Sequence, residues 1–373
     1  MAINKISYKK EKKWEYNDLE LKDINLIVGK NAAGKTRTLS SIVNLLNFII
    51  QHLEKEFEIL GEYKVEFEDN GTIYYYELNS CMENNSLKIL KEILYNGDKE
   101  YLIRKNDGTG QIFSEQENKM LEFSIDTNIP AIFAKRDKLH HKVLDRIISW
   151  CQTNMYCKFG SELGKTKGLN ERHLEDIYDY SFENAEQLVR NLKISLEKRE
   201  YKEEFKEKLL KQMADLGYDI ESIKFVKYAN GVYGIALREK DIKNNINQLE
   251  MSQGMFRAFS LITHSLINLY EHKVNLMVID DIGEGLDYER ATKLIKLIIE
   301  NAQESGSQLL MATNDRHIMN KTPLKYWQVI KRENDKIKFY SYKNNKEIFD
   351  EFEFTGLSNF DFFSTEFYAE NDK

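Results

Sequence analysis

The chain has 373 residues, 42% of them hydrophobic and 31% charged, which is enough for one large domain or two ordinary ones with a hydrophobic core. It carries 54 lysines and arginines against 61 aspartates and glutamates, and the net charge of −7 excludes a protein that wraps nucleic acid over its whole surface. With 2 prolines and 18 glycines, collagen-like and proline-rich sequences are excluded as well. We therefore predict a folded globular protein.

The number of cysteines and the hydropathy of the sequence indicate the cellular compartment. The three cysteines are an odd number without CxxC spacing, which supports neither a disulfide framework nor a zinc ribbon; they are Cys81, Cys151 and Cys157. No run of 18 apolar residues occurs, and residues 1–16 lack the apolar segment of a signal peptide. We expect a cytoplasmic protein that does not enter a membrane.

The N-terminal part begins with a strand, a glycine-bounded loop and a helix. Residues 24–28 form a short apolar run typical of a strand, and helical apolar recurrence is clear from Ser40 onward. Over residues 65–113, short alternating runs are separated by Asn70-Gly71, Asn96-Gly97 and Asp107-Gly108. These pairs supply the positive φ angles of tight hairpin turns, so this segment predicts an antiparallel meander.

The rest of the chain is first helical and then alternates helices with apolar strands. Residues 139–216 are rich in charge and carry leucines at four-residue steps, which predicts a helical subdomain. The elements predicted after it are strands at 223–226 and 232–237, a helix over 254–270, a buried strand over 274–279, a helix over 288–301 and a strand over 307–313. This alternation predicts a mainly parallel sheet that binds ligands at the carboxyl ends of its strands.

The loop between the first strand and its helix fits the phosphate-loop pattern GxxxxGK[ST] at every position. Its residues are Gly29, Lys30, Asn31, Ala32, Ala33, Gly34, Lys35 and Thr36. The glycines let successive backbone N–H groups curl around a phosphate, and the helix adds its positive N-terminal end. We expect Lys35 to reach the β- and γ-phosphates of a nucleotide and Thr36 to bind Mg²⁺, with Arg37 also among the nucleotide-binding residues. The alternative is an ordinary strand-to-helix turn.

Two acids follow the apolar run at 274–279. We expect Asp280 to hold Mg²⁺ through a water and Asp281 to orient, or accept a proton from, the attacking water. An Asp-Asp pair also ends strands without any function, but the phosphate loop upstream favours the catalytic interpretation.

Ser252, Gln253 and Gly254 stand at the start of a predicted helix, 28 residues upstream of Asp280. A Ser-x-Gly sequence there can present a hydroxyl, backbone N–H groups and a helix N-terminus to an anion. On its own the pattern fits a simple N-cap equally well.

In their order and spacing, these three motifs resemble the phosphate loop, signature and acidic strand of ABC-type ATPases. Gly285-Leu286-Asp287 looks like the D-loop of that superfamily, and Thr313-Asn314-Asp315 occupies the place of its switch loop. The resemblance implies that two protomers close around ATP and Mg²⁺ as a homodimer. It implies that the signature residues and Asp287 act across the dimer, and that Lys35, Asp281 and Asn314 are the catalytic set.

Within this superfamily, the sequence DDIGEGLDYER, the interrupting meander and the absent membrane segment resemble the soluble branch with SMC, RecF and OLD-like heads. ATNDRHIMN and FTGLSNFDFF also look like stand-alone bacterial ATPases of defence or toxin–antitoxin loci. This second resemblance implies an effector protein that is controlled in trans.

Two positions depart from the superfamily pattern. Asp281 stands where glutamate is usual, and Asn314 stands where a histidine commonly senses the γ-phosphate. Both residues keep hydrogen-bonding capacity, but water positioning is sensitive to about an ångström. We therefore expect slow turnover.

Several residues keep two interpretations. Trp14 and Tyr16 could stack on adenine or belong to the core. The phenylalanines at 352, 354, 360, 362 and 363 could be core, whereas Phe362, Phe363 and Phe367 would mark a partner surface if they are exposed. The lysines at 9, 10, 12 and 13 could meet nucleic acid or form a solvated face. Gln111 is a weak candidate for the Q-loop glutamine, because a surface strand position explains it better.

Together these features predict an α/β protein: a mainly parallel, P-loop (ABC-type) ATPase core with an antiparallel β meander and a helical lid. We divide it into an N-terminal lobe (1–138), a helical lid (139–220) and a C-terminal lobe (221–373). The function predicted is an ATPase that closes as a dimer and gates an effector protein. The alternative is a RecF-like ATPase that binds DNA through local basic patches in repair or maintenance.

Overall fold

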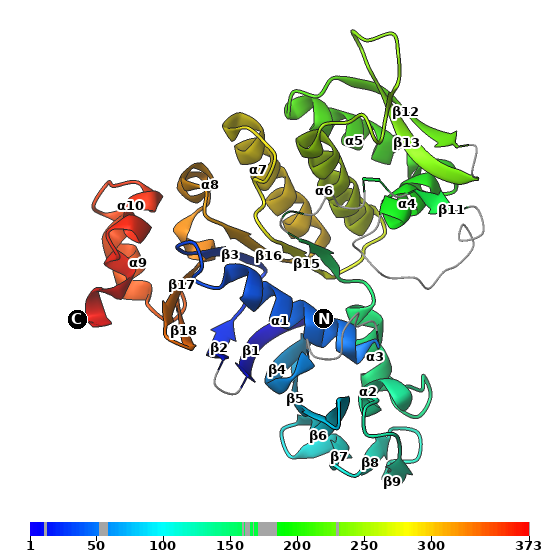
Figure 1. The fold of residues 1–373 in the computed structure, drawn as a ribbon, viewed down its shortest axis with the longest axis vertical. Coiled ribbons are helices and arrows are strands. Elements are labelled where there is room, and N and C mark those ends of the chain that lie inside the picture. Colours follow the sequence, from blue (N-terminus) through cyan, green and yellow to red (C-terminus); the bar gives the residue numbers. More distant parts are fainter. Residues whose placement is uncertain are drawn as a thin grey trace. The chain divides into compact units, whose positions relative to one another are not determined.

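A computed structural model of the chain describes residues 1–10, 13–51, 59–158, 160, 165–166, 168–170, 185–228 and 231–372 (Figure 1). The chain divides into two compact units. Unit 1 comprises Met1–Asn154, Lys325–Thr355 and Glu366–Lys373, and unit 2 comprises Met155–Leu324 and Gly356–Thr365. The predicted division at residues 138 and 220 stays a prediction.

Unit 1 contains a sheet with the strand order β3-β17-β18-β2-β1-β4-β5-β6-β7-β8-β9. Its strands are β1 (Ala2–Lys10), β2 (Trp14–Glu20), β3 (Ile24–Val28), β4 (Gly61–Asp69), β5 (Thr72–Glu83), β6 (Ser86–Asn96), β7 (Lys99–Arg104), β8 (Thr109–Ser114), β9 (Lys119–Ser124), β17 (Trp327–Glu333) and β18 (Lys336–Ser341). The pairs β3–β17 and β18–β2 are parallel, and the strands from β4 to β9 are antiparallel. The predicted meander is confirmed.

The turns of the meander are those that the Asn-Gly and Asp-Gly pairs predicted. Asn70 and Gly71, with φ of 50° and 78°, connect β4 to β5, and Gly97 and Gly108 also have positive φ between their strands. A fourth turn was not predicted: Asn84 and Asn85 join β5 to β6 with φ of 51° and 61°. Asparagine tolerates this left-handed region through its short polar side chain, so glycine is not required there.

The helices of unit 1 are α1 (Lys35–Ile49), α2 (Ala131–Ala134), α3 (Lys142–Cys151), α9 (Lys346–Glu353) and the 3-10 helix η4 (Phe367–Asp372). In α1, the apolar recurrence places Leu39, Ile42 and Leu46 in the core. In the C-terminal segment, Tyr368 packs against Tyr340 of β18. Burial of α1 against the sheet holds the loop that precedes it.

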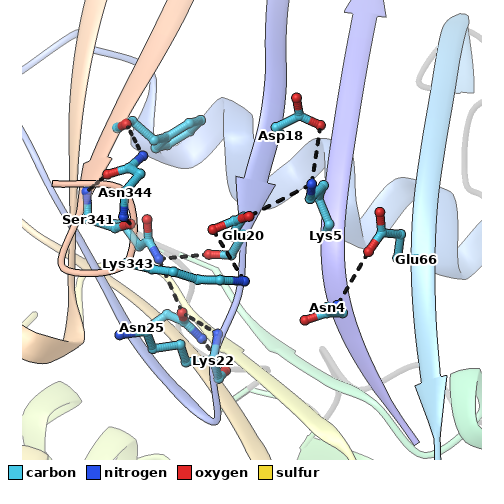
Figure 2. A network of polar contacts seen from close by, with 12 residues as sticks. Asn4, Lys5, Asp18, Glu20, Lys22, Asn25, Glu66, Ser341, Lys343 and Asn344 are labelled. Atoms are coloured by element: carbon cyan, nitrogen blue, oxygen red, sulfur yellow. Dashed lines mark hydrogen bonds and ion pairs between the residues drawn. The ribbon is translucent and has the colours of Figure 1, made fainter. Parts of the chain in front are cut away.

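A network of charged and amide side chains lies along β1, β2 and the segment after β18 and reaches Asn25 of β3 (Figure 2). Lys5 lies 3.9 Å from Asp18 and 3.7 Å from Glu20, and Lys343 lies 3.4 Å from Glu20. Asn25, the second residue of β3, donates to the Lys22 carbonyl at 2.6 Å and accepts from its N–H at 2.9 Å. Partly exposed ion pairs contribute at most about 1 kcal/mol each, so we assign the network a role in strand register.

Unit 2 contains three parallel strands, a small antiparallel sheet and helices. The parallel strands are β10 (Met155–Cys157), β15 (Leu276–Ile279) and β16 (Gln308–Thr313), paired in the order β10-β15-β16. The small sheet consists of β11 (Leu169–Asn170), β12 (Ile220–Lys227), β13 (Val232–Glu239) and β14 (Ile246–Asn247). The helices are α4 (Ala185–Glu197), α5 (Lys202–Asp215), α6 (Gln253–Tyr270), α7 (Tyr288–Ser305), α8 (Arg316–Lys321) and α10 (Asn359–Ser364); a 3-10 helix, η3 (Leu324–Tyr326), precedes β17.

Helix α6 is the centre of unit 2, and nearly all of its side chains from Gly254 to Leu269 are buried. It packs against α7 (Figure 1), and a buried amide network joins the two: Asn301 Nδ2 donates to Ser265 Oγ at 2.9 Å and to Gln212 Oε1 of α5 at 3.0 Å. The strand predicted at 274–279 is shorter than expected. Val274 lies outside β15 and is 42% exposed, and burial begins at Asn275, whose carbonyl accepts from Gln308 N at 2.8 Å.

The phenylalanines near the C-terminus are mostly core. Phe352, Phe362 and Phe363 are 1%, 0% and 8% exposed, whereas Phe354, at the end of α9, is 91% exposed. No helix in the described part of the chain is both long and apolar enough to cross a membrane.

Candidate nucleotide-binding and catalytic sites

The predicted phosphate loop lies in unit 1 between β3 and α1. Its backbone is curled by two residues with positive φ, Ala32 at 62° and Gly34 at 107°, and Ala33 N donates to the Lys30 carbonyl at 3.1 Å. Lys35 Nζ donates to the carbonyls of Gly29 at 2.8 Å and Lys30 at 3.2 Å. The loop therefore wraps around the ammonium group that we expect to bind phosphate.

Both glycines of the loop are required by packing. A Cβ on Gly29 would lie 2.4 Å from Ile330 Cγ2, and a Cβ on Gly34 would lie 1.7 Å from Trp14 Cη2. Trp14 is 2% exposed, with the Arg37 guanidinium 4.7 Å from its ring centroid. Of its two interpretations, the position favours a core aromatic that supports the loop over one that stacks on adenine.

The N-terminus of α1 is suited to an anion. Its N-cap is Gly34, so no side chain caps it, and its first turn contains no acidic residue. Thr36 and Arg37 are exposed in that turn. The N–H groups that no side chain caps and the positive end of the helix dipole therefore fit a phosphate group, and the residues present fit a nucleotide in this loop.

A pocket of about 400 Å³ lies along α1 beside the loop. Among the described residues that line it, three side chains are cationic and none is a carboxylate: Tyr8, Lys10, Lys13, Trp14, Arg37, Ser40, Ser41 and Asn44. Burial, and then repulsion from Lys13 and Arg37, lower the pKa of Lys10 below its ordinary value. This pocket could not be predicted from the sequence. Lys10 and Lys13 belong to a run of lysines typical of a solvated surface, and they line the pocket only together with residues of α1. Lys12 of that run lies outside the described residues.

In unit 2, β15 delivers Asp280 and Asp281. Asp280 is 3% exposed, and its backbone N–H donates to the Cys157 carbonyl of β10 at 2.9 Å. Asp281 is partly exposed and adopts a φ of 49°, in the left-handed region. A non-glycine residue in this region is uncommon, and such strain concentrates at functional sites.

A buried arginine of α6 joins these acids. Arg257 is 2% exposed and donates from Nη2 to the carbonyls of Asp280 at 2.7 Å and Asp281 at 3.1 Å. Its Nη1 lies 3.0 Å from Glu284 Oε2, and Glu284 Oε1 accepts from Gly160 N at 2.8 Å. Sequence analysis missed Arg257 and its partner. A charged residue within the otherwise apolar stretch that follows the signature was the available signal.

The signature residues open α6. Ser252 is its N-cap, with Oγ accepting from Met255 N at 3.2 Å, and Ser252 and Gln253 are both exposed. Gly254 is buried, and a Cβ on it would lie 2.1 Å from the Gly285 carbonyl of the expected D-loop. The N-cap interpretation of Ser252 therefore holds, and its O–H remains able to donate to another molecule.

The expected D-loop and switch residues begin the next two helices of unit 2. Asp287 is the N-cap of α7; it accepts from Arg290 N at 3.0 Å and pairs with its guanidinium at 2.6 Å. The Arg290 N–H, more than its charge, holds the pKa of Asp287 below the ordinary value. Asn314 is exposed directly after β16, and Asp315 caps α8. Asp287 and Asn314 thus stand at the surface of unit 2.

Two further predictions concern the Q-loop glutamine and the binding of magnesium. Gln111 is an exposed residue of β8, as a surface strand position predicts. Among the described residues, no group of three or more histidine, cysteine, aspartate or glutamate side chains could hold a metal ion. Magnesium in nucleotide sites needs only one or two protein ligands beside phosphate oxygens and water, so the expected roles of Thr36 and Asp280 stay a prediction.

Neither a protein-family model nor a curated protein matches the sequence. Solved structures do. The Smc head bound to the C-winged-helix domain of ScpA has a TM-score of 0.55 at 14% identity, covering 93% of this chain and all of that one. The Smc head domain of Pyrococcus furiosus, with an extended coiled coil and bound to the C-terminal domain of ScpA, has a TM-score of 0.50 at 14% identity, covering 94% of this chain and 99% of that one. The chain therefore has the fold of an SMC head, and the predicted fold class is confirmed.

Proposed function

We propose that the chain is an ATPase that binds Mg-ATP and closes as a homodimer around two nucleotides. The observation that carries the proposal is the phosphate loop: a complete GxxxxGK[ST] sequence, curled around Lys35, before a helix without a side-chain cap. The fold of an SMC head supports the same assignment. The three-cation pocket beside α1 is placed to attract the rest of the nucleotide.

Each site residue has a role in this proposal. Lys35 and the loop N–H groups neutralise the β- and γ-phosphates, and Thr36 and Asp280 hold Mg²⁺, which supplies further positive charge when bound. Asp281 orients the attacking water. Asn314 donates a hydrogen bond where a histidine is usual, and this difference, together with the shorter Asp281, is the reason to expect slow turnover.

The proposal that two protomers form a dimer rests on the exposure of the signature and D-loop residues. Ser252, Gln253 and Asp287 are exposed residues of unit 2, as residues that act on a partner protomer must be. ATP would favour the closed dimer because these residues gain contacts only when the partner holds a γ-phosphate.

We further propose that closure gates a partner protein in the cytoplasm. The two Smc heads were solved with ScpA, a protein partner of their own, which supports a protein partner in general. The placement in defence or toxin–antitoxin systems stays a prediction from the sequence resemblance.

The test is Lys35→Ala, with Lys331→Ala as control, a lysine of the same unit that pairs with Glu366 at 3.9 Å. The Lys35 variant should lose at least about 100-fold in ATP affinity and all measurable phosphate release, because the charge that meets the β- and γ-phosphates is gone. The control should match the parent. Calorimetric titration and phosphate release measure this, with circular dichroism to confirm folding. A folded Lys35 variant with parental affinity and turnover would refute the proposal.

A DNA-binding ATPase is the second candidate, and the observation that favours it is the cluster of Lys10, Lys13 and Arg37. Its affinity for DNA would fall steeply with salt because phosphate contacts release counterions. The test is a DNA-binding assay at about 50 mM salt on the parent and on a variant with Lys10 and Lys13 replaced by alanine. This role of the cluster is excluded if the parent does not bind DNA, or if the variant binds it as well as the parent.

A further inference from the structure

We propose that Arg257 is the positioning residue that sets the backbone conformation of Asp281 and thereby the place of its carboxylate. This inference rests on the proposed function, in which Asp281 orients the attacking water. It concerns residues of unit 2 only, and it assigns a role to a side chain that follows the signature residues on α6 and had none.

The argument begins with the two carbonyls. The Asp280 carbonyl belongs to the peptide group before Asp281, whose orientation sets φ of Asp281, and the Asp281 carbonyl belongs to the peptide group after it, whose orientation sets ψ. A single nitrogen, Nη2 of Arg257, donates to both, at 2.7 and 3.1 Å. Arg257 therefore holds both soft dihedral angles of Asp281 at once.

Asp281 is a residue that needs such a constraint. Its φ of 49° lies in the left-handed region, which is uncommon for a residue other than glycine and which hydrogen bonds to the flanking carbonyls help to hold. The guanidinium suits the task because its donors have a fixed planar geometry, whereas a lysine ammonium on a flexible stem has none. Arg257 is also 2% exposed, so water does not compete for its hydrogen bonds.

Glu284 completes the arrangement as the counter-charge. A buried guanidinium is costly unless it is paired, and Glu284 Oε2 lies 3.0 Å from Nη1. The other oxygen of Glu284 accepts from Gly160 N at 2.8 Å. Because both oxygens are engaged, Glu284 is a support for Arg257 and not a substitute base for Asp281.

The experiment compares Arg257→Lys with Arg104→Lys. Arg104 is the matched control in unit 1: it is 1% exposed and donates to two carbonyls, of Ile89 at 3.3 Å and Asp126 at 3.1 Å, within the meander. We expect Arg257→Lys to lower kcat 10- to 100-fold and to leave the Kd for ATP within threefold. Arg104→Lys should leave kcat per folded molecule unchanged. Equal effects of the two substitutions on kcat would mean a general structural role and would overturn the inference.

A double-mutant cycle with Asp281→Asn tests the route of the effect. If Arg257 acts through Asp281, Arg257→Lys should lower turnover no further in the Asp281→Asn background. Multiplication of the two effects would refute the inference. Glu284→Gln removes the charge that pairs with Arg257 and places an amide N–H against a donor at one of its two contacts. We therefore expect it to lower kcat about as much as Arg257→Lys, and no further in the Asp281→Asn background. A loss near that of Asp281→Asn, or one that multiplies with it, would make Glu284 the water-orienting acid instead.

If Arg257→Lys does not fold, the paired change Arg257→Gln with Glu284→Gln removes both charges and takes its place in the same comparison. The outcomes separate this inference from the proposed function. A parent protein without ATP turnover refutes the function, whereas a parent that turns over and depends on Lys35 and Asp281 but not on Arg257 refutes only the positioning role.

Discussion

Two helix starts in this molecule carry predicted nucleotide contacts, and they are built differently. Helix α1 of unit 1 follows Gly34 and has no side-chain cap, whereas α6 of unit 2 follows Ser252, whose hydroxyl already accepts from Met255 N. The first start leaves its N–H groups for an external anion. The second has one N–H group, that of Met255, capped by its own serine, so it offers an anion fewer N–H groups together with the serine O–H. The comparison predicts a primary phosphate site at α1 and a weaker, later contact at α6.

The two regions also differ in how their parts are distributed along the chain. The phosphate loop comes from one stretch of eight residues, although Trp14 and Ile330 pack against its glycines. The arrangement around Asp281 joins Gly160, Arg257 and Glu284, which are separated by up to 124 residues. Loss of a single contact should therefore affect the second region in a more graded way than loss of Lys35 affects the first.

The largest effect in unit 2 is expected for Asp281→Asn. Turnover should fall on the order of 1,000-fold, because an amide does not accept a proton from the water, while ATP affinity should stay within threefold. Asparagine tolerates left-handed backbone well, so the substitution should preserve the local conformation. Single-turnover phosphate release and light scattering measure the loss and the expected accumulation of closed dimer.

Asp241→Asn, at an exposed position of unit 2, serves as the control and should match the parent. Near-parental turnover of the Asp281 variant would remove the catalytic role from this residue. The contrast between a phosphate-binding unit 1 and a hydrolytic unit 2 would then have to be abandoned.

The next effect concerns the α6 start. Ser252→Arg should leave ATP binding within threefold but prevent ATP-induced dimerisation and lower turnover about 100-fold, because a bulky cation replaces the exposed hydroxyl. Gly254 is a poorer test: any Cβ there would meet the Gly285 carbonyl, so a defect would only report misfolding. Light scattering with and without ATP, paired with phosphate release, measures the outcome.

Losing an N-cap costs about 1 kcal/mol by itself, and Ser358→Arg controls for that cost. Ser358 caps α10 with its own capping box and is exposed. Mixing the Ser252 and Lys35 variants should restore at most one composite site per heterodimer. Should Ser252→Arg protein dimerise on ATP and hydrolyse it at the parental rate, the signature assignment fails.

Most of the fold could be predicted from the sequence, because apolar periodicity and turn residues act locally. The strand at 24–28, the meander with its Asn-Gly turns and the alternation of α6, β15, α7 and β16 all follow from such patterns. The loop of the candidate site was equally visible, since its chemistry needs glycines and a lysine at fixed spacing.

The rest could not be predicted because it depends on contacts between distant segments. Nothing in the spacing of Arg257 and Asp281 reveals that one side chain holds two carbonyls. Lys10 and Lys13 line a pocket only because α1 packs beside them. Phe354 is exposed within a run of buried phenylalanines, because its neighbours are placed by separate helices, α9 and α10.

The smallest expected effect is on the pH dependence of stability, in which α6 should differ from α1. Helix α6 buries His264, whose Nδ1 lies 2.8 Å from the Ser260 carbonyl and whose pKa is lowered by burial to about 4. Helix α1 contains no histidine. In the unfolded chain the histidine pKa is about 6.5, so between about pH 6.5 and 4 the unfolded state binds more protons than the folded state. The stability contributed by neutral His264 is full above pH 6.5 and is lost as the pH falls through that window, by about 2 kcal/mol at pH 5.

His264→Leu should remove this part of the acid sensitivity, because leucine stays uncharged in both states and fits an apolar helix face. We expect urea unfolding to show a difference in stability between pH 7 and pH 5 that is about 2 kcal/mol smaller for this variant than for the parent. His272→Asn, at an exposed position with φ of 50° that asparagine tolerates, is the control and should keep the parental difference. Leucine at 264 also removes a polar ring from the core, so the variant can be more stable at pH 7, and only the change between the two pH values decides. An unchanged pH difference in His264→Leu would show that α6 is no more sensitive to acid than α1, and the contrast drawn from the buried histidine would be lost.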